Sequence, residues 1–248
     1  MIAAVRSADR RIDAWSRGWW GDGPASADAV GRTDAALRVA VFLSLCAAVI
    51  QGCVHLADLV LLDRRWEYLD AGGDAGVFMW ASAVATFAAA VGLAWCAVLV
   101  RRGRRPLLLM AAFVAFLSLD DTVQIHERAG DLVQRLSTTT EIGRLAWPVI
   151  YLPLIAALAL GLVALTRRAP GRIGRLVALA LIAFGIAVLL ELASFLILRL
   201  GFDYGGWVYE TEVAIEEGLE LAGWMVIAAA LGACSLHLAA RTDRRDPD

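Results

Sequence analysis

Acidic and histidine side chains gather in two short stretches of this chain, and each stretch adjoins a long apolar run. The first stretch contains Asp120, Asp121, His126 and Glu127, and the second contains Glu216, Glu217 and Glu220. Carboxylates and imidazoles are the usual protein ligands of iron, manganese and zinc, and they also transfer protons in acid–base catalysis. The two stretches therefore predict either a metal site or a group of protonatable acids.

Six apolar segments are long enough to position these residues across a membrane. Hydrophobic residues make up 60% of the 248 residues and charged residues only 19%, which is typical of a multi-pass membrane protein. A helix needs about 20 apolar residues to cross the hydrocarbon layer. Segments of this length lie at about 37–62, 76–100, 106–127, 147–166, 173–199 and 211–239. The sequence therefore predicts an all-α fold in which six transmembrane helices form one bundle.

The arginine residues predict the orientation of the bundle. All 23 basic residues are arginine, and 17 of them fall on the side that carries both termini. Because positive charge favours the cytoplasmic side, both termini are predicted to be cytoplasmic. The absence of lysine and asparagine suggests a GC-rich genome, so the predicted location is a bacterial cytoplasmic membrane. The predicted organisation is a cytoplasmic tail at 1–35, either an interfacial helix or disordered, a membrane domain at 36–240 and a second tail at 241–248.

The polar residues inside the predicted spans then share one depth, in the outer half of the membrane. They are His55 and Asp58 in the first span, Asp120, Asp121, His126 and Glu127 in the third, Glu191 in the fifth, and Glu216, Glu217 and Glu220 in the sixth. At about 100° per residue, the polar residues of the first, third and sixth spans each form one stripe. His126 is displaced from its stripe and reaches the others only if the helix unwinds there. The stripes predict that these helices turn their polar faces into one shared interior.

Several carboxylates inside a membrane have to be neutralised. Each one costs about 2.5–3.5 kcal/mol at the membrane centre on the insertion scale, and no arginine lies within the spans at this depth. Shared protons would neutralise the acids, as would a divalent metal or a metal pair, and iron, manganese or zinc is the favoured prediction. The predicted metal ligands are His55, Asp58, Asp120, His126, Glu127, Glu191, Glu216 and Glu220. The predicted catalytic residues are Asp120, Asp121 and Glu217.

Three further acids have simpler explanations in the sequence. Asp70 is predicted to lie in a solvated outer loop, between the first and second spans. Glu210 and Glu212 stand at the start of the last helix, where the positive end of the helix dipole stabilises acids without any functional role.

The two acidic stretches together resemble a known sequence pattern. Leu119-Asp120-Asp121-x4-His126-Glu127, combined with Glu216-Glu217-x2-Glu220, resembles an uncharacterised group of bacterial polytopic membrane proteins. The pattern of that group is D-[DE]-x4-H-E in one span and E-E-x2-E in the last span. The resemblance covers the third and sixth spans and implies no function. The chain lacks the Glu-Glu-x3-Arg motif of CAAX-type proteases, the paired Asp-rich motifs of UbiA-type prenyltransferases and the three-histidine zinc site of alkaline-ceramidase-like hydrolases.

Three functions agree with this pattern. The first is a metal-dependent membrane oxidoreductase or hydrolase whose amphipathic substrate, a lipid, isoprenoid or quinone, enters sideways between helices. The second is a proton- or cation-coupled transporter, because buried acids are the usual carriers of these ions. The third is a proton-initiated terpene cyclase, with Asp120 or Asp121 as the acid and Trp80, Trp207 or Trp224 stabilising a carbocation. Membrane lipids are the expected surroundings, nucleic acid is not an expected partner, and the oligomeric state is open.

Overall fold

The structure is a computed structural model that describes residues 13, 16–17, 19–20, 26–62, 66–72, 76–100, 103–125, 128 and 141–242. The described part contains six α-helices, one short 3-10 helix and no strand. The α-helices are α2 (Ala27–Leu62), α3 (Val77–Leu99), α4 (Arg104–Val123), α6 (Glu141–Thr166), α7 (Ile173–Arg199) and α8 (Trp207–Thr242), and η1 is Glu67–Leu69. The predicted all-α fold is confirmed.

Five of these helices, α2, α3, α4, α7 and α8, are long and apolar enough to cross a membrane. Large apolar side chains cover their outward faces, among them Phe42 at 64% exposed and Leu189 at 65% exposed. A soluble protein of this size would bury such faces, so the helices indicate a membrane protein. The sixth span, at α6, and the cytoplasmic location of the termini remain predictions.

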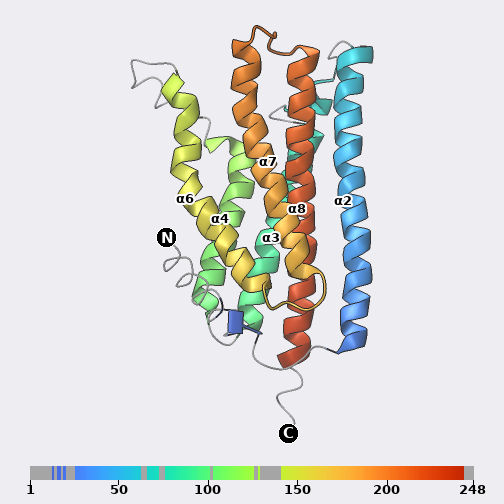
Figure 1. The fold of residues 1–248 in the computed structure, drawn as a ribbon, viewed down its shortest axis with the longest axis vertical. Helices are drawn as coiled ribbons and strands as arrows, with labels where there is room; N and C mark the ends of the chain where they lie inside the picture. Colours follow the sequence, from blue (N-terminus) through green and yellow to red (C-terminus); the bar gives the residue numbers. More distant parts are fainter. Residues whose placement is uncertain are drawn as a thin grey trace.

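Helix α8 occupies the centre of the bundle, between α2 and α7 and in front of α3 (Figure 1). Small residues let the neighbouring helices approach it closely. A Cβ atom added to Gly218 would lie 3.5 Å from Ala48 of α2, and one added to Gly92 of α3 would lie 2.8 Å from Leu231 of α8. On the other side of α8, a Cβ on Gly223 would lie 2.8 Å from the ring of Phe184 in α7.

The observed helices extend beyond the apolar segments at some ends and stop short at another. Helix α2 begins at Ala27 and α8 ends at Thr242, so both helices continue through polar residues beyond their apolar segments. Helix α4 ends at Val123, four residues before the predicted end of the third span. The start of α2 and the end of α8 lie at the same end of the bundle (Figure 1).

Two tryptophans near the N-terminus pack against this end of the bundle. Trp19 is 6% exposed and Trp20 is 2% exposed. The indole N–H of Trp19 donates to the carbonyl oxygen of Gly103 at 3.3 Å, and the guanidinium of Arg241 lies 5.3 Å from the ring centre of Trp20. These contacts join the N-terminal segment to α8 and to the connection before α4.

Candidate functional site

An elongated cavity of about 560 Å³ lies between α4, α6, α7 and α8. Met79 and Ser82 of α3 and the backbone segment Ala71–Gly72 complete its wall. Small-molecule sites in proteins commonly have volumes of about 300–1,000 Å³. The cavity is therefore large enough for a small molecule or for one chain of a lipid.

Six carboxylates line this cavity. They are Asp120 and Asp121 of α4, Glu191 of α7, and Glu216, Glu217 and Glu220 of α8. Glu217 is close enough to Glu220, Asp121 and Glu191 for their charges to act on it. No arginine or histidine is among the described residues that line the cavity. Acids from three helices therefore face the same cavity.

The end of α4 fixes the position of the two aspartates. Asp120 and Asp121 lie in the last turn of α4, and Gln124 directly after it adopts a left-handed conformation with φ 54° and ψ 47°. The N–H of Gln124 donates to the carbonyl oxygen of Asp120 at 2.6 Å. Few residues other than glycine adopt this conformation, and here it ends the helix where the side chain of Gln124 reaches the cavity. The third span, predicted at about 106–127, is thus interrupted at Gln124, and the sequence did not predict this position because glutamine gives no signal for such a helix end.

Two further polar groups contact the acids. The hydroxyl group of Tyr151 in α6 is hydrogen-bonded to the carboxylate of Asp120. The carboxyl groups of Glu212 and Glu216, one turn apart on α8, are close enough to act on each other. Glu212 is 6% exposed, and neither of its oxygens has an N–H or O–H donor among the described residues. Glu212 is therefore buried beside another acid, although the sequence suggested an acid stabilised only by the helix dipole.

The remainder of the cavity is apolar. Leucine, isoleucine and valine residues of α6 and α7 form most of this part. The rings of Phe184 and Trp224 also line it and pack against each other, with their centres 4.9 Å apart. The residues of α8 that line the cavity run from Glu216 to Ile227, a rise of about 16 Å along the helix at 1.5 Å per residue. The cavity is thus amphipathic, acidic at one end and apolar along the rest.

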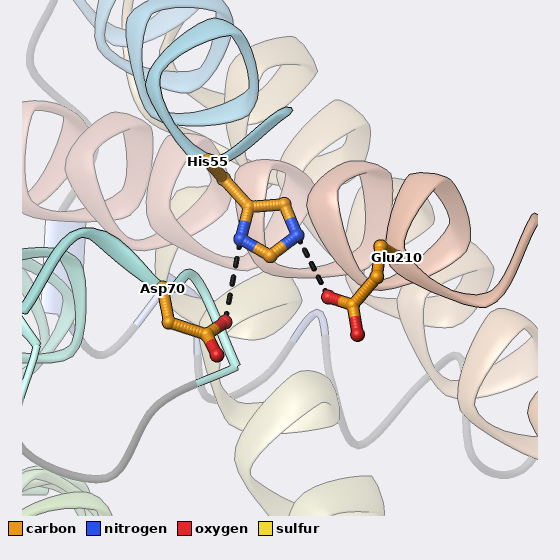
Figure 2. Close-up of side chains that lie close together, drawn as sticks. All are labelled: His55, Asp70 and Glu210. Atoms are coloured by element: carbon orange, nitrogen blue, oxygen red, sulfur yellow. Dashed lines mark ion pairs between the residues drawn. The ribbon is translucent and has the colours of Figure 1, made fainter. Parts of the chain in front are cut away.

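His55 belongs to a different group, formed with Asp70 and Glu210 (Figure 2). Its Nδ1 atom lies 3.3 Å from Oδ1 of Asp70 and its Nε2 atom lies 3.0 Å from Oε2 of Glu210. His55 and Glu210 are each 4% exposed. The three residues offer ligand atoms that all lie within 4.8 Å of one another, so this buried group could hold a metal ion.

The structure does not bring His55 and Asp58 to the acids of the cavity. Both residues are buried on α2, and α2 contributes no residue to the described cavity wall. Helix α2 packs on the face of α8 that carries Gly218, whereas Glu216 and Glu220, two residues away on either side, point about 160° from that face. The predicted shared interior therefore divides into two parts, on opposite sides of α8.

The other predicted site residues lie as follows. His126 and Glu127 fall outside the described residues. Asp58 is 4% exposed, and its Oδ1 atom has no hydrogen-bond partner in the described part of the chain.

Sequence reasoning missed Asp70 and Glu210 as partners of His55. Asp70 is not a freely solvated loop residue, because its side chain contacts His55 and accepts a hydrogen bond from the N–H of Gly72 at 3.1 Å. Glu210 stands in the first turn of α8, as the sequence indicated, but is turned toward α2. The predicted depth that His55 and Glu210 share, on two neighbouring helices, was the available signal for this pair.

One family model matches most of the chain. The model described as a domain of unknown function, DUF8692, matches residues 35–234. Comparisons with curated proteins and with solved structures found no match. The match covers the apolar helices and all six acids of the cavity.

Proposed function

The chain belongs to the DUF8692 family, and we propose that it is a metal-dependent membrane enzyme acting on a lipid-like substrate. One observation carries the proposal: six carboxylates from three helices line one end of an otherwise apolar cavity. The proposed setting is the outer half of a bacterial cytoplasmic membrane, with six spans and both termini in the cytoplasm. The reaction is a hydrolysis or an oxidation.

The charge of the acidic end supports a bound metal. Six ionised carboxylates would place up to six negative charges in one cavity, and each close pair costs several kcal/mol at low dielectric. One or two divalent cations remove most of this repulsion. Glu216, Glu220, Glu191 and Asp120 are the proposed metal ligands, and they would have to draw together around the ion. Among the described residues, the group whose ligand atoms already lie within 4.8 Å of one another is His55, Asp70 and Glu210.

The donor atoms of the cavity favour a hard cation. Carboxylate, amide and phenol oxygens are the polar groups that the described cavity wall offers, apart from the hydroxyl of Ser82. All-oxygen sites suit manganese and magnesium better than zinc, which prefers nitrogen and sulfur. Of the three metals predicted from the sequence, manganese fits this wall best.

The remaining acids are suited to proton transfer. Glu217 and Asp121 interact with each other beside the proposed ligands. A carboxylate next to a metal-bound water can take its proton, which is the usual part of a general base in metal-assisted hydrolysis. Glu217 and Asp121 are therefore proposed as catalytic residues. Asp120, which Tyr151 orients, is proposed both as a metal ligand and as a catalytic residue.

The apolar part of the cavity supports an amphipathic substrate. Its walls on α6 and α7 would enclose a hydrocarbon chain, while the acids and the metal face the polar group of the substrate. Leu152 and Leu189 line the cavity and are also 62% and 65% exposed. The cavity wall therefore reaches the lipid-facing surface at α6 and α7, where a lipid-like substrate would enter sideways.

A terpene cyclase is the second candidate, and one observation favours it. Trp224 and Phe184 line the same cavity as the acids, and aromatic faces stabilise carbocations. Trp80 and Trp207, the other tryptophans considered from the sequence, are 68% and 73% exposed and do not line the cavity. In this candidate the acids hold protons, and no metal is needed.

Elemental analysis tests the main proposal. We expect protein purified in mild detergent and loaded with manganese to retain at least about one metal ion per chain after gel filtration. Glu220→Gln should lower that content by more than half, because it removes a proposed ligand. Asp203→Asn, at an exposed acid that does not line the cavity, is the matched control and should retain the metal. Metal-free wild-type protein after loading would refute the proposal and favour the cyclase.

A further inference from the structure

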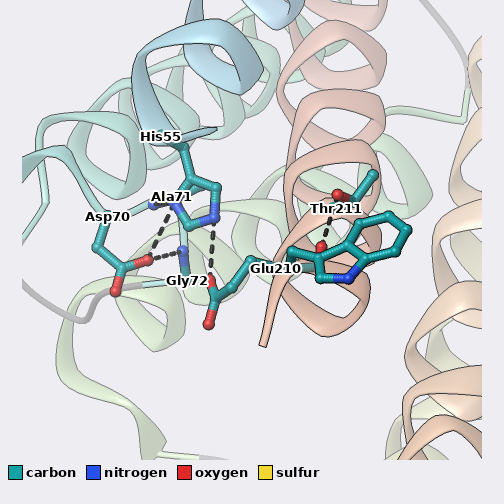
Figure 3. Close-up of polar contacts among 7 residues, drawn as sticks. His55, Asp70, Ala71, Gly72, Glu210 and Thr211 are labelled. Carbon is teal, nitrogen blue, oxygen red and sulfur yellow. Dashed lines mark hydrogen bonds and ion pairs between the residues drawn. The ribbon is translucent and has the colours of Figure 1, made fainter. Parts of the chain in front are cut away.

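The backbone next to Asp70 joins the two polar groups of the structure. Ala71 and Gly72 line the cavity, although they lie in the connection between α2 and α3. The N–H of Ala71 donates to Nδ1 of His55 at 2.9 Å, as Figure 3 shows. His55 therefore contacts a segment of the cavity wall without lining the cavity itself.

The hydrogen bonds determine which ring nitrogen of His55 carries the proton. Nδ1 cannot both accept from the N–H of Ala71 and donate to Asp70. The contact with Ala71 is the shorter, 2.9 Å against 3.3 Å, and a backbone N–H can only donate. Nδ1 therefore presents its lone pair to Ala71, which leaves the proton on Nε2, the nitrogen that lies 3.0 Å from Oε2 of Glu210.

The segment Ala71–Gly72 is closely surrounded, so its backbone has little room to move. Ala71 is 2% exposed, and a Cβ on Gly72 would lie 3.0 Å from the side chain of Val213 in α8. Asp70, which precedes the segment, also acts on Glu217 through its charge. A displacement of this segment would therefore change both the shape and the charge of the acidic end.

We propose that His55 is a positioning residue for the cavity, because it holds the wall segment Ala71–Gly72 through Nδ1 and is itself fixed to α8 through Nε2 and Glu210. This proposal rests on the proposed function in one respect: it takes the cavity to be the place where the reaction occurs. It assigns no metal to His55, because a metal at either nitrogen would displace one of these two contacts.

Two substitutions separate the two nitrogens of His55. His55→Asn places an oxygen near the position of Nδ1, so it keeps an acceptor for the N–H of Ala71. His55→Gln reaches the position of Nε2 instead and keeps the donor to Glu210. His237→Asn is the matched control, since His237 contacts Thr33 at 2.9 Å and joins the same two helices, α2 and α8, away from the cavity.

Hydrogen exchange and carboxyl labelling test the proposal on detergent-purified protein treated with EDTA. The exchange of the Ala71 amide should become roughly three- to tenfold faster in His55→Gln, as expected for the loss of one hydrogen bond. Labelling of Glu216, Glu217 and Glu220 by dicyclohexylcarbodiimide, followed by mass spectrometry, should change at least about threefold in the same variant. Wild-type values are expected for both measurements in His55→Asn, which is the rescue, and in His237→Asn.

Three outcomes would overturn the proposal. In the first, His55→Gln leaves both exchange and labelling unchanged. In the second, exchange changes but labelling does not, which would make His55 a structural residue of the loop only. In the third, His55→Asn and His55→Gln both lose one equivalent of metal that the wild type retains before EDTA, which would identify His55 as a ligand. A wild type without metal would refute the proposed function alone, because exchange and labelling are measured after EDTA.

Discussion

Glu217→Gln gives opposite results for a metal-filled cavity and for one that only shares protons. The substitution keeps the size of the side chain and removes one carboxylate from the acidic end. Glu217 is the informative choice because four neighbouring acids act on it: Glu220, Asp121, Glu191 and Asp70.

The magnitude of the repulsion follows from the spacing of the acids. Glu217 and Glu220 are three residues apart on α8, so their Cβ atoms lie about 5–6 Å apart. Two unit charges at about 6 Å repel each other by about 3 kcal/mol at an effective dielectric constant of 20. In a cavity without metal, Glu217→Gln would remove this repulsion, so the free energy of unfolding would stay constant or rise.

A bound metal reverses the sign. The carboxylate of Glu217, although not a proposed ligand, would then supply one of the negative charges that balance the cation, and removing one partner from such a buried group costs about 3–5 kcal/mol. For a chain of this size, 1 kcal/mol shifts Tm by about 2–4 °C. We therefore expect Glu217→Gln to lower the Tm of the manganese-loaded protein by about 6–20 °C.

Thermal unfolding with and without manganese measures this difference. Manganese at about 100 times its Kd should stabilise the wild type by about 2.7 kcal/mol through mass action and the variant much less. Asp203→Asn is the control for the loss of an acid outside the cavity. A Glu217→Gln protein that is more stable than the wild type and does not respond to manganese would refute the metal reasoning.

Three other predictions concern the phenol at the acids, the packing of α8 and the topology. Tyr151→Phe removes the hydrogen bond to Asp120, and because such bonds to charged groups contribute about 1.5–3 kcal/mol, we expect at least about tenfold weaker manganese binding by equilibrium dialysis. Gly92→Ala should lower stability by about 1–3 kcal/mol in thermal unfolding, because the new Cβ would lie 2.8 Å from a leucine of α8. Gly185→Ala, which meets nothing within 4 Å, should not. A reporter enzyme fused within 101–106 should be active in the cytoplasm and one fused at residue 70 on the outside, and the reverse pattern would contradict the arginine argument.

The sequence was sufficient to predict the helices and to select the acids of the cavity. Apolar length gave the spans, and the cost of a charge in lipid distinguished Asp120, Asp121, Glu191, Glu216, Glu217 and Glu220 from ordinary interfacial residues. The structure places all six of them in one cavity wall. Their roles as metal ligands and catalytic groups remain predictions, because lining the same cavity does not establish what a carboxylate binds or which proton it transfers.

The partners of His55 could not be predicted in the same way. Depth and helical periodicity describe one helix at a time, whereas the neighbour of a polar stripe depends on which helix packs against which face. The small residues Ala48 and Gly218 allow α2 to pack on one face of α8. Nothing in the sequence of either helix alone indicates that these two residues lie opposite each other. The break at Gln124 was missed for another reason, since glutamine is not a typical residue for a left-handed helix end.

The residues of α8 that pack against α2 and the acids of α8 that line the cavity lie on different faces of the helix. This arrangement determines how the effects of substituting the acids should be interpreted. One face carries small residues that allow α2 to approach, and the face about 160° away carries Glu216 and Glu220. Glu216 and Glu220 therefore do not support the contact between α2 and α8, and Glu217, about 100° from Gly218, lies to the side of that contact. A loss of stability in Glu217→Gln would then report on what the acids bind if it depends on manganese. His55 is the exception, because it lies on the α2 side and contacts the cavity wall only through Ala71.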